Sequence, residues 1–125
     1  MKAEENDDVQ TETAAMTAQV FTLARQVPAG RVLSYSALGA RCEPPISGYV
    51  CGRIMNNVGD DVPWWRIVAK NGALPIAKRN PNLALRQREL LEAEGVKFDA
   101  DNRVLESYFE TDAKLQSDEN DSLFA

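Results

Sequence analysis

The side chains that this sequence lacks restrict its chemistry as much as those it contains. The chain has no histidine and two cysteines, Cys42 and Cys51. Histidine is the side chain whose charge changes near neutral pH, so histidine-based acid–base catalysis is excluded. Two cysteines without histidine cannot complete a tetrahedral zinc site, and their spacing matches neither a CxxC redox pair nor a disulfide framework. We therefore expect reduced, buried thiols in a cytoplasmic protein that holds no metal and no cofactor.

Aromatic and basic chemistry is concentrated in the run Pro63-Trp64-Trp65-Arg66. An indole has no nucleophilic atom suited to methyl transfer, but its flat apolar face can enclose a nucleic-acid base or stack on it. The alternative is a hydrophobic pair in a strand, with one ring packed inward and the other against the opposite face. The run therefore indicates binding rather than turnover.

Charge is distributed unevenly along the 125 residues. Residues 1–16 contain one lysine against five acidic residues, and residues 111–125 contain one lysine against four. We expect both segments to be solvated, disordered tails, and neither shows the apolar run of a signal peptide or membrane anchor. Between residues 25 and 88, ten basic residues stand against three acidic ones. This stretch could bind a polyanion although the net charge of the chain is −5, and an ordinary solvated surface is the alternative.

Hydrophobic spacing predicts one domain over residues 17–110, beginning with an amphipathic helix over residues 17–27. Ser34 or Ser36 can cap a short helix that ends near residue 41, and Ser47 can cap another over about residues 47–57. Two short helices joined by a tight turn resemble a helix-turn-helix, whose second helix would enter a groove of DNA.

The second half of the domain is predicted to supply a small β wing. Asn71-Gly72 is a strong two-residue turn signal between the β-prone runs 65–69 and 73–76, which predicts a hairpin. Further elements are expected as a helix from Asn80 to Gly95 and short strands at 96–98 and 103–105. The expected fold class is a mostly α, single-domain winged helix-turn-helix.

Four short motifs, in this order, resemble the DNA-binding domain of O6-alkylguanine-DNA alkyltransferases and, more closely, the alkyltransferase-like proteins. They are the family's IPxGxVxTY motif at Val27–Tyr35, its PCHRV motif at Pro63–Val68, Asn71-Gly72, and Leu90–Val96. The resemblance covers roughly Val20 to Tyr108. It implies a DNA-binding domain in which a damaged base is rotated out of the duplex.

In the enzymes of this family the cysteine of PCHRV accepts the alkyl group, activated by the adjacent histidine and by a more distant glutamate. Trp64 stands at the cysteine position and Trp65 at the histidine position, where alkyltransferase-like proteins usually have PWHR. Glu94 matches the glutamate, with nothing left for it to orient. The resemblance therefore implies a protein that is not an enzyme, with Trp64 and Trp65 lining a lesion pocket and with Arg66 and Glu94 as structural support.

The family fills the gap left by the flipped base with an arginine, and Tyr49 stands at that position here. We expect Tyr49 to wedge into the stack and Arg53 to contact phosphate or base, and a half-buried Tyr49 is the alternative. Tyr35 matches the tyrosine that crowds the phosphate of the flipped nucleotide, and Ser34 precedes it, where amide groups can reach phosphate. A turn tyrosine with a buried ring is the alternative for Tyr35.

In alkyltransferase-like proteins a basic residue beyond the hairpin lies near the flipped guanine and makes a cation–π contact. Direct counting from Trp64 reaches Ala77, but a short insertion would bring Arg79 to that place. A solvated loop charge is the alternative for Arg79.

The resemblance implies a monomer that recognises O6-alkylguanine in double-stranded DNA and presents it to nucleotide excision repair proteins. One competing hypothesis is a winged-helix transcription regulator that reads undamaged sequence. Another is a true alkyltransferase that uses Cys42 or Cys51, although neither cysteine lies in a PCHR setting.

Overall fold

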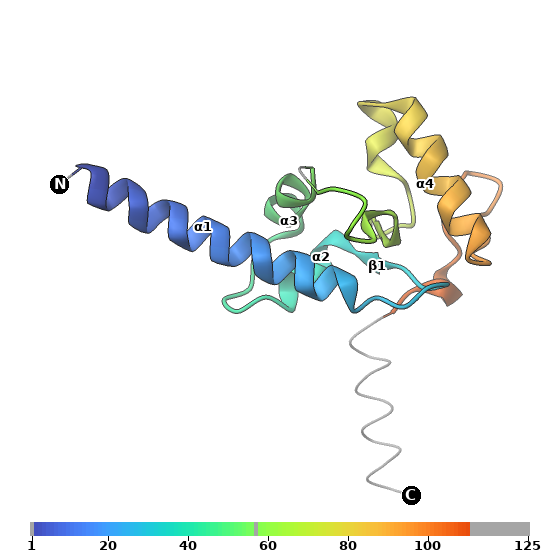
Figure 1. Cartoon of the computed structure of the whole chain (residues 1–125). Helices are drawn as coiled ribbons and strands as arrows, with labels where there is room; N and C mark the ends of the chain where they lie inside the picture. The colour runs from blue at the N-terminus through green and yellow to red at the C-terminus, as the bar shows by residue number, and fades with distance from the viewer. Residues whose placement is uncertain (1, 57, 111–125) are drawn as a thin grey trace, which may run out of the picture.

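The computed structural model describes residues 2–56 and 58–110, and for residues 2–13 only the path of the backbone. The C-terminal segment expected to be a tail, residues 111–125, lies outside the described residues. The elements in chain order, with 3-10 helices labelled η, are α1 (Lys2–Arg25), β1 (Leu33–Ser34), α2 (Tyr35–Ala40), α3 (Gly48–Met55), η1 (Trp64–Arg66), β2 (Ile67–Val68), η2 (Pro75–Lys78), α4 (Pro81–Ala93) and η3 (Glu106–Tyr108) (Figure 1).

Helix α1 extends much further toward the N-terminus than the sequence predicts. It begins at Lys2, so the segment expected to be a disordered tail is helical almost from its start (Figure 1). No proline or glycine interrupts residues 2–25, and the segment is rich in alanine and glutamate, which favour helix. The C-terminal half of α1 joins the core through Val20 and Ala24, which are fully buried.

Helices α2 and α3 form the expected helix-turn-helix. The hydroxyls of Ser34 and Ser47 each accept a hydrogen bond from the amide three residues later, at 3.0 and 3.1 Å. Of the two serines considered for α2, Ser34 is therefore the cap. Gly39 of α2 lies against the carbonyl of Ile46 with no room for a Cβ, which lets the turn before α3 approach α2 closely.

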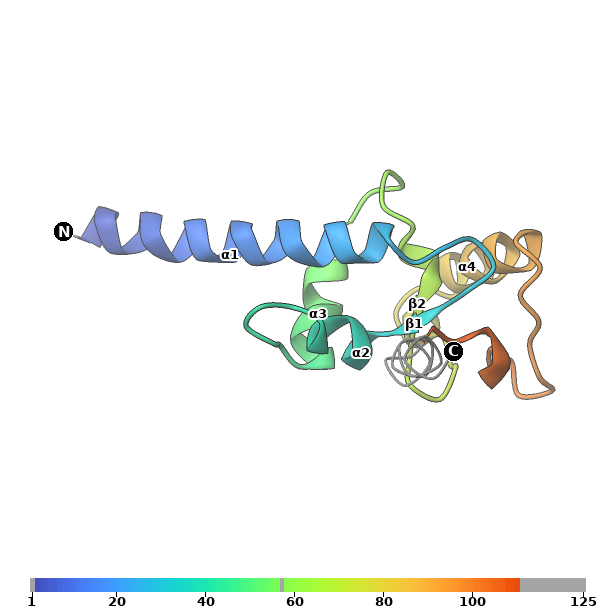
Figure 2. The same cartoon turned by 90° about the horizontal axis from the view of Figure 1, so that it is seen from below.

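Two short parallel strands separate the two parts of the core. Leu33 of β1 pairs with Ile67 of β2, and both face the cluster built on α1, α2 and α3. The neighbouring residues Val32 and Val68 belong instead to the cluster that contains Leu91 of α4, because successive strand residues point to opposite faces. Figure 2 shows the two strands between the first three helices and α4.

The expected β-hairpin is not formed, although its turn is. Gly72 N donates to Ala69 O at 2.9 Å, and Gly72 has a φ of +86°, in the left-handed region that glycine tolerates. The segment expected to be the second strand contains Pro75, which has no amide hydrogen to donate to a ladder, and it forms η2. The carbonyl of Gly72 instead accepts a hydrogen bond from Val104 N at 2.9 Å.

Helix α4 has the predicted ends. Asn80 Oδ1 accepts a hydrogen bond from Leu83 N at 3.1 Å, and Gly95 has a φ of +91° just beyond the helix. The two short strands expected at 96–98 and 103–105 are reduced to one isolated antiparallel bridge between Phe98 and Val104. The predicted fold class, a mostly helical single domain with a small β component, is confirmed.

Candidate nucleic-acid interface

Two adjoining hollows lie between α3, the loop before η1, and η2. The inner cavity has a volume of about 140 Å³ and the outer cleft about 300 Å³. Tyr35, Asn56 and Ile76 line both hollows, so they are continuous. The inner cavity is also lined by Met55, Val58, Asp60, Trp64, Leu83 and Gln87. The outer cleft is also lined by Gly48, Tyr49, Gly52, Arg53, Pro75, Lys78 and Arg79.

Trp64 forms one wall of the inner cavity. It begins η1, and its partly buried ring packs against the core cluster of the first three helices. The indole Nε1–H donates to Asp60 Oδ1 at 3.0 Å, which fixes the orientation of the ring. The other oxygen of Asp60 accepts a hydrogen bond from Arg86 at 3.1 Å. An oriented aromatic face thus borders a cavity large enough to receive part of a base.

Trp65 is turned away from the inner cavity, contrary to the expectation that both tryptophans line it. Its ring packs against the second core cluster, with the two indole planes at 84° and their centroids 6.0 Å apart. The Nε1–H of Trp65 donates to Glu94 Oε2 at 2.9 Å. Successive residues of a helical turn point in different directions, and the Glu94 carboxylate draws Trp65 to the opposite side of η1. The expectation that nothing remains for Glu94 to orient is therefore also wrong.

Glu94 is the centre of a hydrogen-bonded group that we call the Glu94 cluster, made of Gly30, Trp65, Arg66 and Glu94. Arg66 lies 2.7 Å from Glu94 Oε2, with the two side chains only 16% and 15% exposed. Gly30 N donates to Glu94 Oε1 at 3.2 Å, and Arg66 also donates to Val27 O at 2.9 Å. The cluster ties the end of α4 to η1 and to the loop after α1.

The charge state of Glu94 follows from these contacts. Burial by itself would raise the pKa of Glu94. The hydrogen bonds from Arg66, Trp65 and Gly30, together with the charge of Arg66, outweigh burial and lower that pKa below its usual 4.5. At neutral pH Glu94 is therefore a carboxylate whose oxygens already have donors.

Tyr35 stands at the junction of the two hollows, at the first position of α2. Its ring faces Gly52 of α3, where an added Cβ would lie 3.8 Å from the ring. Burial raises the pKa of Tyr35 to about 12, and the nearby Cys51 adds to the shift. The phenol therefore stays protonated and can donate a hydrogen bond to an anion.

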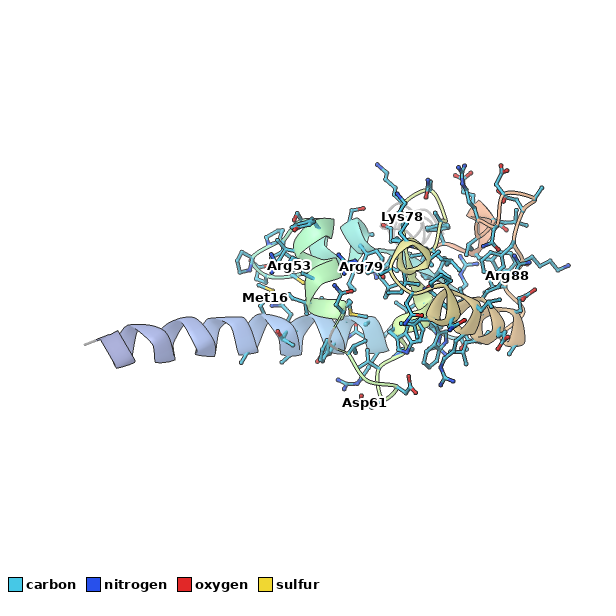
Figure 3. All side chains as sticks on the ribbon, turned by 90° about the horizontal axis from the view of Figure 1, so that it is seen from above. Met16, Arg53, Asp61, Lys78, Arg79 and Arg88 are labelled. Atoms are coloured by element: carbon cyan, nitrogen blue, oxygen red, sulfur yellow. The ribbon has the colours of Figure 1, made fainter. Side chains whose placement is uncertain are left out.

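The outer cleft carries the positive charge of the site. Arg53 lines it from α3, and Lys78 and Arg79 line it from η2 and the residue after it. Figure 3 shows these three side chains toward one side of the molecule and Asp61 toward the other. A polyanion placed along this side would meet cations from two elements.

Arg79 therefore borders the outer cleft, whereas we expected it in the lesion pocket. Within this segment Ile76 of η2 is the residue that reaches the inner cavity, whereas Arg79 follows the end of η2. Across the cleft, Tyr49 is 72% exposed, so the half-buried alternative does not hold. The guanidinium of Arg53 lies 6.0 Å from the centre of the Tyr49 ring.

Ser34 does not present its side chain to solvent, so its contact with DNA stays a prediction for the backbone amide alone. It is 7% exposed, and its hydroxyl caps α2 and lies 3.2 Å from the Ser36 hydroxyl. A cap residue directs its oxygen into its own helix, which removes that oxygen from the surface.

Cys42 and Cys51 are free, buried thiols. Burial raises the pKa of Cys51 to about 12, and the nearby Cys42 adds to this shift. Burial also raises the pKa of Cys42. Nucleophilic sulfur requires the thiolate, so neither side chain has the character of an alkyl acceptor. Within the described residues, no group of side chains could hold a metal ion and no helix is long and apolar enough to cross a membrane.

Three polar residues of the inner cavity, Asn56, Asp60 and Gln87, were not predicted from the sequence. Gln87 is 2% exposed and donates to backbone carbonyls of η1 and β2 at 3.2 and 3.1 Å. Its helical spacing from Ala84 and Leu91 was a usable signal, because all three share the buried face of α4. Asn56 and Asp60 gave no such signal, since the loop between them has no periodic pattern.

The chain is similar to known DNA-binding proteins over most of its described length. Residues 15–96 match the family model described as the DNA-binding domain of 6-O-methylguanine DNA methyltransferase. A DNA base-flipping protein from Vibrio parahaemolyticus serotype O3:K6 (strain AQ3810) is 29% identical over 80 residues, which make up 62% of this chain and 77% of that protein.

Two crystal structures share the fold. S. pombe Atl1 in complex with damaged DNA containing O6-carboxymethylguanine has a TM-score of 0.66 and 23% identity, and S. pombe ATL in complex with DNA has a TM-score of 0.67 and 20% identity. Each of the two matches covers 78% of this chain and 96% of the S. pombe chain. The residues matched by the family model, 15–96, include the helix-turn-helix and the segment that carries Trp64.

Proposed function

This chain belongs to the family of the 6-O-methylguanine DNA methyltransferase DNA-binding domain, and we propose that it is an alkyltransferase-like, non-enzymatic sensor of O6-alkylguanine in DNA. The observation that carries the proposal is Trp64. At the position where the resemblance places the acceptor cysteine, an oriented indole faces a cavity that opens into a basic cleft. Such a site encloses a base and offers no atom to receive its alkyl group.

A base inside a duplex cannot reach this cavity, so the nucleotide must rotate out at a cost of about a few kcal/mol of unstacking. Tyr35 would assist, because it lines both the inner cavity and the outer cleft, and its protonated phenol could donate to the phosphate of the rotated nucleotide. Exposed Tyr49 is the candidate to fill the gap in the stack. Arg53 and Arg79 would then hold the flanking phosphates.

Repair chemistry by the protein itself is disfavoured at each candidate residue. Trp64 has no suitable nucleophilic atom, and the Glu94 carboxylate is engaged by three donor residues. Cys42 and Cys51 are buried, with raised pKa values. We therefore assign the removal of the lesion to partners, nucleotide excision repair proteins by family resemblance, which a cytoplasmic, monomeric sensor would recruit.

The test is binding to two duplexes that differ by one O6-methyl group. We expect the damaged duplex to bind about tenfold tighter, a size typical of base–aromatic stacking, and both affinities to fall steeply with salt as counterions are released. Equal affinities at every salt concentration would overturn the proposal. Affinity that followed base sequence instead would support a winged-helix regulator.

Replacing Arg53 with alanine should weaken both complexes and reduce the salt slope by about one. The matched control is Arg88→Ala, because Arg88 lies on α4, away from the cleft, and pairs with Glu92 (Figure 3). If both variants changed binding equally, the outer cleft would not be the DNA-binding surface.

A further inference from the structure

The inner cavity has a distinctive charge. Among the described residues that line it, Asp60 is the one that carries a formal charge at neutral pH. The Nε1–H of Trp64 donates to Asp60 Oδ1, so the carboxylate is held beside the indole that forms the wall. The basic residues Arg53, Lys78 and Arg79 line the outer cleft and not the inner cavity. A group that has passed the basic outer cleft and lies in the inner cavity is therefore bordered by an anionic side chain and not by a cationic one.

Arg86 compensates this charge only in part. Its guanidinium bonds to the other oxygen of Asp60, at 3.1 Å, and Arg86 does not line the cavity. The side chains of Arg86 and Asp60 are 55% and 67% exposed, and ion pairs this exposed are weakened by water and salt. The charge closest to an occupant of the cavity is consequently negative.

We propose that Asp60 sets the charge of the lesions that this chain accepts: the cavity takes uncharged O6-alkyl groups and disfavours adducts that end in a carboxylate. The inference rests on the proposed function, because it presumes that the rotated guanine carries its adduct into the inner cavity. Coulomb repulsion between two carboxylates at close range, in a partly solvated cavity, is enough to change affinity severalfold.

The sharpest probe is a pair of adducts equal in size that differ by one charge. O6-carboxymethylguanine, present in the S. pombe Atl1 complex, is compared with its amide, O6-carbamoylmethylguanine, in the same duplex. Because both duplexes release the same phosphate counterions, the ratio of the two dissociation constants isolates the charge of the adduct. We expect the full-length protein to bind the carboxymethyl duplex about fivefold more weakly than the amide duplex, with undamaged DNA weaker than the amide.

Asp60→Asn should bring the ratio close to one, since its amide oxygen can still accept the hydrogen bond from Trp64. Asp61→Asn is the matched control, because it removes the same charge from the adjacent residue, which pairs with Arg25 and does not line the cavity. Arg86→Gln removes the compensating cation and leaves the carboxylate, so it should widen the ratio. This variant keeps the inference testable even if Asp60→Asn does not fold.

The possible outcomes distinguish a failure of the role of Asp60 from a failure of the proposed damage sensor. A wild-type ratio of one, with both adducts bound more tightly than undamaged DNA, would overturn the role of Asp60 and leave the damage sensor intact. Equal binding of all three duplexes would remove the sensor itself. A ratio that changed as much in Asp61→Asn as in Asp60→Asn would show a general effect of net charge and reject the inference.

Discussion

Trp64 and Trp65 are adjacent in the chain, yet they lie in two regions of opposite character. Trp64 borders an open cavity, and its indole N–H bonds to an exposed aspartate. Trp65 packs against the second core cluster and bonds to Glu94, a largely buried carboxylate that Arg66 and Gly30 also engage. One tryptophan is available to a ligand and the other is part of the scaffold.

The difference shows how a site without an alkyl acceptor can retain the hydrogen bonds that hold its elements together. By resemblance, Glu94 belongs to a relay that would activate a nucleophile, but here its oxygens accept hydrogen bonds that join α4, η1 and the loop after α1. Trp65 supplies one of those hydrogen bonds in place of the histidine. Trp64, by contrast, donates its hydrogen bond to the exposed Asp60 and lines the inner cavity, so its ring is available to contact a ligand.

The largest expected effect comes from breaking the Glu94 cluster. Glu94→Ala leaves Nε and Nη2 of Arg66 and the Trp65 N–H without their acceptor, although Arg66 Nη1 keeps its bond to Val27 O, and should lower the free energy of unfolding by about 3–5 kcal/mol. Glu92→Ala is the control, because its ion pair with Arg88 is exposed and should contribute less than about 1 kcal/mol. Urea unfolding followed by tryptophan fluorescence measures both. Similar losses would mean that the cluster is not a structural centre.

A second change should separate the tryptophans by function. Trp64→Ala removes a stacking face and should abolish most of the roughly tenfold preference for an O6-methylguanine duplex over undamaged DNA, a loss of about 1 kcal/mol. Trp65→Phe keeps an aromatic ring against the second core cluster and loses one hydrogen bond to a carboxylate. It should cost about 1.5–3 kcal/mol of stability with no change in the preference. A loss of preference in Trp65→Phe equal to that in Trp64→Ala would erase the distinction between the two regions.

Acid should weaken the Glu94 cluster selectively. The pKa of Glu94 is lower in the folded protein than its ordinary value of 4.5, so its contribution to stability is fully present above that value and is lost as pH falls through the folded pKa. The difference in unfolding free energy between wild type and Glu94→Gln should therefore be largest near neutral pH and shrink in acid. Urea titrations at several pH values measure it. A difference independent of pH would contradict the assignment of a stabilising carboxylate.

Local chemistry was the part of the fold that the sequence made predictable. The caps Ser34, Ser47 and Asn80 and the left-handed Gly95 were all deducible because each depends on a few neighbouring residues. The strand expected over 73–76 was a failure of the same local reasoning, since it gave the apolar run more weight than Pro75 within it.

The motifs located the site residues along the chain, but they did not indicate which way the side chains point. The PCHRV-like run located Trp64, and the IPxGxVxTY-like run located Tyr35. Both residues line the inner cavity. The orientation of Trp65 depends on a carboxylate 29 residues away, and the presence of Asp60 in the cavity depends on the path of a loop. Neither distance nor direction across the fold is encoded in local spacing, which is why these contacts required the structure.

The smallest expected effect is that of Trp64→Cys, which restores the family's acceptor atom and should still give no measurable methyl transfer. An ordinary thiol has a pKa near 8.5 and is only about a few per cent thiolate at neutral pH. Trp65 offers an N–H donor and no acceptor, and that N–H is committed to Glu94. The new thiol would therefore have no base beside it.

Adding Trp65→His supplies what the single variant lacks. One ring nitrogen of the histidine can donate to Glu94, as Trp65 does, which leaves the other nitrogen to accept the proton of the thiol. The double variant should gain the mass of one methyl group on incubation with O6-methylguanine DNA, detected by intact-protein mass spectrometry, whereas the single variant should not. Loss of two aromatic rings threatens the fold, so a thermal melt and lesion binding must first show that both variants are native. If the native double variant gained no methyl group, or if the single variant reacted as fast, Glu94 and a restored histidine would not activate the thiol at position 64.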